Sequence, residues 1–137
     1  MPVLLRNAYY TLEKEGVSPV LYCVLSAASC EDEAAVRRAQ MELAAALEPF
    51  DRRRHVILVD VRQGPTSHEP GIEEVLRQAR RILFADFNRA AVIVKTAAGR
   101  LQAIRHARDD GLEPRIFLDD EEAARAYLSA PPDAELT

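Results

Sequence analysis

Two almost uninterrupted apolar runs constrain the fold of this chain more than any other feature of its sequence. They are HVILVDV at 55–61 and AAVIVK at 90–95. Runs of this kind are typical of strands that are buried on both faces, as in a parallel sheet covered by helices. A helical apolar pattern follows each run, at 71–84 and from 97 to about 108. This alternation predicts an α/β fold with a largely parallel sheet.

The N-terminal part has a different pattern. Two β-prone segments, 8–13 and 20–26, are separated by a Gly- and Pro-containing turn at 15–19. This arrangement predicts an antiparallel hairpin joined to the parallel strands. A helix follows, with Ser29 as its predicted N-cap and with an inward face made of Val36, Ala39, Leu43 and Leu47. Pro49 is expected to end it.

The C-terminal half supplies further start and stop signals. Thr96 is the predicted cap of the helix that begins at 97, and Gly111 is its predicted stop. We expect this helix to turn Leu101, Ile104 and Ala107 inward. RIFL at 115–118 is a short strand, and Asp119 with Glu122 forms an acidic capping box for the last helix.

The 137 residues fit a single domain, 1–137, with a core at about 8–129 and a loose tail at 130–137. The net charge of −4 argues against a nucleic-acid partner, because phosphate binding needs a basic surface. No apolar run approaches the ~20 residues of a transmembrane helix. The first residues are too short and too polar for a signal peptide. We therefore expect a cytoplasmic protein.

The cysteines and histidines indicate no metal site. Cys23 and Cys30 are expected to be reduced thiols, the first of them packed in the core. His55, His68 and His106 lie in separate segments without ligand spacing. We expect neither a metal nor a cofactor.

Three stretches carry a family resemblance: HVILVDVRQ at 55–63, FNRAAVIVKTAAGRLQAIRH at 87–106 and RIFLDDEEAARAYL at 115–128. Together with the hairpin, they resemble the SpoIIAA-like, or STAS-like, domains related to anti-sigma-factor antagonists, over roughly residues 8–129. The resemblance implies a STAS-like fold and a non-enzymatic role in bacterial signalling through a protein partner. Some relatives in this group are similar to lipid-binding domains.

The family's functional mark is a D-S-S-G-L-G-like turn whose serine is phosphorylated by a partner kinase. If Gly71 matches the motif's glycine, Glu69 and Pro70 occupy the two serine positions. The phosphoacceptor is then missing from its usual place. Ser67 is a displaced phosphosite candidate, as is Thr66, and Glu69 could act there as a fixed negative charge.

Candidate site residues lie where the parallel strands end, which is where ligands bind to open α/β sheets. The polar loop 62–70 is the first group, with Arg62, Thr66, Ser67, His68 and Glu69. The start of the helix at 97 is the second, where Thr96, Gly99 and Arg100 could hold an anion. The alternative for each is structural: a solvated connection, and a capped helix with a small residue for close packing.

Three functions from different classes remain open. The first is a STAS-like interaction module that binds a protein through the loop 62–70 and the second helix, as a monomer or homodimer. The second is a carrier of a small molecule or lipid, which requires an apolar pocket between sheet and helices. The third is an enzyme, which we rank last because the adjacent Ser67, His68 and Glu69 do not converge as a catalytic triad does.

Overall fold

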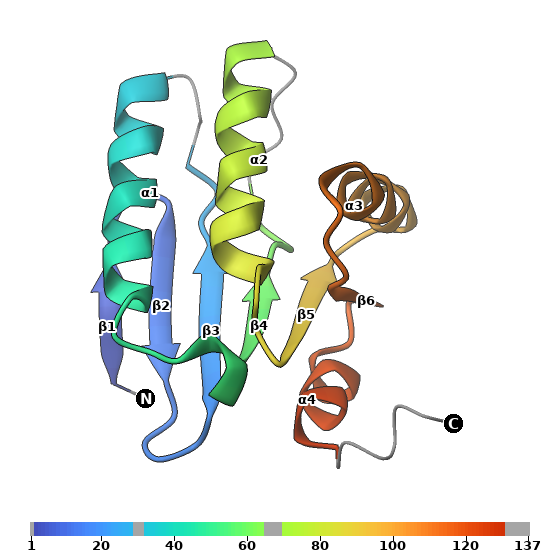
Figure 1. Ribbon diagram of the computed structural model, residues 1–137. Helices are drawn as coiled ribbons and strands as arrows, with labels where there is room; N and C mark the ends of the chain where they lie inside the picture. Colours follow the sequence, from blue (N-terminus) through green and yellow to red (C-terminus); the bar gives the residue numbers. More distant parts are fainter. Residues whose placement is uncertain (1, 29–31, 65–69, 131–137) are drawn as a thin grey trace.

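Six strands form one mixed sheet in the computed structural model, which describes residues 2–28, 32–64 and 70–130 (Figure 1). The strands lie in sequence order: β1 (Val3–Arg6), β2 (Tyr10–Lys14), β3 (Val20–Leu25), β4 (Val56–Asp60), β5 (Arg89–Val94) and β6 (Arg115–Leu118). The helices are α1 (Glu33–Leu47), α2 (Pro70–Phe84), α3 (Ala97–Asp110) and α4 (Glu121–Ser129), with a short 3₁₀ turn η1 (Arg52–Arg54). Strands β1 to β3 are antiparallel, and β3 to β6 are parallel.

The α/β class, the antiparallel hairpin and the parallel strands are therefore confirmed, but the sheet has one strand more than predicted. The additional strand, β1, pairs with β2 through Leu5 and Leu12. It is four residues long and mostly exposed, so it lacks the alternation of apolar and polar residues that would reveal it. The antiparallel part is consequently a three-stranded meander.

The two faces of the sheet are covered unequally. Ile57 and Val59 point to the face that carries α1, α2 and α3, whereas Val56 and Leu58 point to the face that carries α4. Figure 1 shows α1 and α2 running alongside the strands, while α3 is seen almost end-on and crosses their direction. Gln40 of α1 links the first two helices, because its side-chain amide donates to the carbonyl of Val75 at 2.8 Å.

Several predicted helix signals are confirmed. Thr96 caps α3 by accepting from the Gly99 N–H, and Gly111 ends it in a left-handed conformation with φ of 68°. Helix α1 ends at Leu47, two residues before Pro49. Among the helices in the described ranges, none has the length and apolar character needed to cross a membrane.

Two predicted caps were wrong. The N-cap of α1 is Asp32, whose carboxylate accepts from the Ala35 N–H, and Ser29 lies outside the described residues. The N-cap of α4 is Asp120 rather than Asp119. Asp119 has a positive φ of 46°, and its carboxylate binds Arg62 instead. A run of adjacent acids offers several possible caps, and the tertiary partner decides between them.

Candidate functional site

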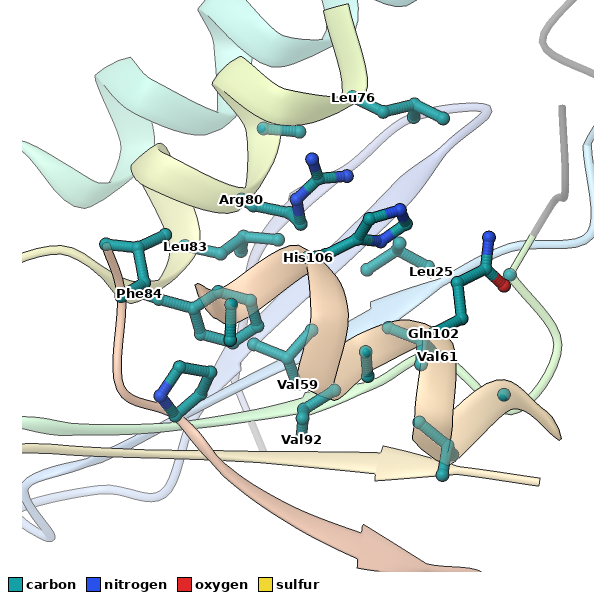
Figure 2. Close-up of a pocket in the computed structure, with 18 of the residues that line it drawn as sticks. Leu25, Val59, Val61, Leu76, Arg80, Leu83, Phe84, Val92, Gln102 and His106 are labelled. Carbon is teal, nitrogen blue, oxygen red and sulfur yellow. The ribbon is translucent and has the colours of Figure 1, made fainter. Parts of the chain in front are cut away.

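A cavity of about 350 Å³ lies between α2, α3 and the sheet (Figure 2). Its floor includes Val59 and Val92 from the two central parallel strands, and Leu83 and Phe84 of α2 form one wall. The cavity, called the slot below, extends from Gly64 and Gly99, near the carboxyl ends of the strands, to Leu112 and Pro114. Most of its lining is apolar, as is usual for small-molecule sites.

The cavity exists because α3 places small side chains against the sheet. Gly99, Ala103 and Ala107 line it, whereas the larger Leu101 and Ile104 are 63% and 37% exposed. The prediction that Leu101 and Ile104 face inward was therefore wrong. Helical spacing identifies an apolar stripe but not which side of the helix the sheet will meet. Here the stripe of small residues is the one that packs.

A cluster of charged side chains lines the cavity on the side of α2 and α3. Asp110 has no exposed side-chain surface, and its carboxylate accepts from Nε of Arg80 at 2.5 Å. Nε of Arg77 lies 3.6 Å from the same carboxylate, and Arg81 donates to the Asp110 backbone carbonyl at 3.4 Å. A buried carboxylate requires such partners, because an unpaired charge is costly to bury. Asp110 therefore already engages the guanidinium groups around it.

His106 lies over the cavity, between Arg80 and Gln102 (Figure 2). Its Nε2 lies 3.7 Å from a carboxylate oxygen of Glu73, and its side chain is 27% exposed. Burial lowers the pKa of this imidazole below 6.5, and the charge of Arg80 lowers it further against the opposing effect of Glu73. His106 is consequently uncharged at neutral pH and can donate or accept a hydrogen bond.

Arg62, a predicted site residue, ties three elements together. Its guanidinium contacts Asp60 at 2.8 Å, and Asp119 and Glu121 at 3.1 Å each. Burial alone would raise the pKa of the Asp60 carboxyl, but the hydrogen bonds from Arg62 outweigh it and leave that pKa below its usual value. Although Arg62 borders the cavity, its guanidinium is already paired with three carboxylates of the same chain.

Tyr22 completes this network on the α4 face. Its hydroxyl donates to Asp60 at 3.3 Å. Burial, together with the negative charges of Asp60 and Glu121, raises the pKa of Tyr22 to about 12. The phenol therefore stays protonated at neutral pH and acts as a donor that holds the carboxylate in place.

The predicted site residues are only partly brought together. Thr96 and Gly99 lie at one end of the cavity, whereas Arg100 is exposed and does not line it. Thr66, Ser67, His68 and Glu69 lie outside the described residues, as does Cys30. Gly99 fits its structural alternative, because a Cβ at this position would come within 3.2 Å of the capping hydroxyl of Thr96.

Sequence reasoning missed the cluster of Glu73, Arg80, His106 and Asp110, which comes from two helices. Two signals were present. His106 and Asp110 are four residues apart on one helix face, and Arg77, Arg80 and Arg81 form a basic stripe on the second helix that the sequence pattern predicts to be a solvated face. The interpretation of that stripe as a solvated face was wrong for Arg80, which is 19% exposed.

Two nucleophilic side chains of the described residues, those of Cys23 and Thr96, have structural surroundings. Burial raises the pKa of the Cys23 thiol to about 12, so it is not a ready nucleophile. The Thr96 hydroxyl is occupied by the helix cap. Within the described ranges, no three His, Cys, Asp or Glu side chains are grouped to hold a metal ion.

Comparisons with known proteins do not identify a family for this chain. No family model, no curated protein and no solved structure matches the chain.

Proposed function

We propose that this protein binds a small, largely apolar molecule in the slot between α2, α3 and the sheet. The observation that carries the proposal is the 350 Å³ cavity itself, which lies between the sheet and two helices and has a mostly apolar lining. Ordinary protein interiors contain few voids larger than a water molecule. A cavity volume of this size is in the range of small-molecule sites.

The position of the cavity supports the same function. Its lining includes Gly64, Thr96 and Gly99, which follow the carboxyl ends of β4 and β5. Ligands of open α/β sheets enter at this edge. The charged residues of the wall on α2 and α3 are paired with one another, so an incoming molecule meets a preformed wall rather than one that must reorganise.

Two measurements test the proposal. Native mass spectrometry of the protein, purified without denaturant, should reveal a species heavier than the 15.3 kDa chain by the mass of a bound molecule. A neutral apolar dye such as Nile red should bind the emptied protein with one-site saturation and become fluorescent.

A matched pair of substitutions assigns the dye to the slot. Ala103→Leu places three more carbons in the cavity, whereas Ala98→Leu adds the same group to an exposed position of the same helix. We expect Ala103→Leu to weaken dye binding about tenfold or more, and Ala98→Leu to leave it unchanged. Equal affinities in both variants and the parent would contradict the proposal.

The second candidate function is the STAS-like interaction module that the sequence resemblance implies. The specific observation in its favour is the outer face of α3, where Leu101 and Ile104 are exposed beside Arg100, Arg105 and Arg108. No side chain of the described residues forms an ion pair with these three arginines. Such a surface fits a protein partner whose docking face is acidic and partly apolar.

This second function is tested by reconstitution. A partner found by affinity capture is purified, and its affinity is measured against the parent chain, Leu101→Glu and, as the control on α1, Met41→Glu. We expect the α3 variant alone to lose affinity, and the affinity of the parent to fall with salt. Equal binding by the parent and Leu101→Glu would rule out α3 as the docking face.

A further inference from the structure

The charged groups beside the slot limit which molecules it can bind. This inference rests on the proposed function. On the side of α2 and α3, the cation of the cavity wall is Arg80, whose Nε donates to the Asp110 carboxylate at 2.5 Å. Glu73 lies 4.0 Å from Arg80 and 3.7 Å from His106. The wall therefore presents two carboxylates and one guanidinium, all engaged with one another.

A charged ligand would be poorly accommodated by this wall. A carboxylate entering the slot would leave water and face Asp110 and Glu73, which already satisfy Arg80. An ammonium group would meet the guanidinium of Arg80 and could pair only by displacing it. On the side of α2 and α3, the cost of burying either charge is not offset by a free partner. Lys95 also lines the slot, but it is exposed, so an ion pair with it would stay in water and contribute little to binding.

An uncharged polar group has suitable partners at the same place. The imidazole of His106 and the amide of Gln102 lie next to each other over the slot (Figure 2). Within the described ranges, neither the Gln102 amide nor the His106 ring makes a close hydrogen bond, since the nearest His106 contact is the 3.7 Å approach of Glu73. Each can donate to or accept from a hydroxyl or a carbonyl.

We propose that the ligand is an uncharged, elongated, mostly apolar molecule whose single hydroxyl or carbonyl group lies against His106 and Gln102. The size of the slot limits its length. An apolar cavity of ~150 Å³ holds a benzene-sized molecule, so 350 Å³ has room for an alkyl chain on the order of ten carbons.

The experiment uses three probes of equal chain length: 1-decanol, decanoate and decylamine. Each competes with Nile red on the intact chain at pH 7.5, below the critical micelle concentration of the charged probes. We expect 1-decanol to bind at least about tenfold more tightly than either charged probe, because it alone leaves the wall's ion pairs intact. Equal or tighter binding of decanoate or decylamine would overturn the inference while leaving the proposed function standing. Failure of all three probes and of the dye would overturn the proposed function as well.

Two neighbouring substitutions show whether the wall causes this selectivity. Glu73→Gln removes a negative charge beside His106, whereas Glu74→Gln removes one that pairs with Arg77 and does not line the slot. Decanoate should bind about threefold more tightly to Glu73→Gln than to the parent, which is the scale of a partly exposed charge interaction. It should bind Glu74→Gln as it binds the parent. An equal gain in both variants would mean that net charge, not the slot wall, selects the ligand.

Discussion

Helices α1 and α3 pack on the same face of the sheet and differ in what they place against it. Helix α1 buries Val36, Leu43 and Leu47, each with at most 1% of its surface exposed. Helix α3 turns alanine and glycine toward the cavity, places His106 beside Glu73 of α2 and leaves Leu101 in solvent. The first helix fills the space beneath it and the second leaves a cavity. On this one face of the sheet, the packing of α1 therefore stabilises the fold, whereas the packing of α3 leaves room for a ligand.

The largest expected effect separates the two helices directly. Leu43→Ala empties a fully buried site in α1 and should lower the free energy of unfolding by about 3 kcal/mol. Leu101→Ala truncates an exposed leucine in α3 and should change it by no more than about 0.5 kcal/mol. Urea unfolding followed by circular dichroism measures both. Comparable losses would mean that α3 packs as tightly as α1.

The buried carboxylate of α3 should matter more than its apolar residues. Asp110→Asn removes the charge that pairs with Arg80 and should cost about 2 kcal/mol of unfolding free energy, as for hydrogen bonds to charged groups. Asp109→Asn, an exposed neighbour, is the control and should be nearly neutral. If the two variants unfold at the same urea concentration, the ion pair does not anchor α3 to α2.

Filling the cavity should make α3 pack against the sheet as tightly as α1 does. Ala103→Leu adds apolar contacts in the slot and should raise the free energy of unfolding by about 1 kcal/mol in the ligand-free protein. Ala98→Leu should change it little, because that side chain is exposed. If Ala103→Leu is less stable than the parent and still binds the dye, then the slot has no spare volume at this position.

The smallest effect concerns pH. Because the pKa of His106 is lower in the folded than in the unfolded chain, the unfolded state binds the proton first as pH falls. The stability associated with a neutral His106 is thus fully present above ~6.5, the ordinary pKa of histidine, and is lost as pH falls through the lower folded value. His106→Gln should show a shallower loss of stability than the parent between pH 7.5 and pH 5.5. Identical slopes would contradict the lowered pKa.

The comparison also shows which parts of the molecule could be predicted. The strands β4, β5 and β6 and the helices α2 and α3 begin and end within two residues of their predicted bounds. Local signals define them: apolar runs, a threonine cap and a glycine stop. β1 escaped prediction because it is a short exposed edge strand. The inward face of α3 was wrong because Ala103 and Ala107 carry little hydrophobic signal.

The sequence by itself determined the alternation of strands and helices, the antiparallel start and the buried face of α1, because period and capping are properties of neighbouring residues. Only the tertiary structure decided that Arg80, His106 and Asp110 meet, since they come from two helices whose crossing depends on the packing of both. It also decided where the slot lies. A cavity is the space that side chains from distant segments leave unfilled, and no local pattern in the chain encodes that space.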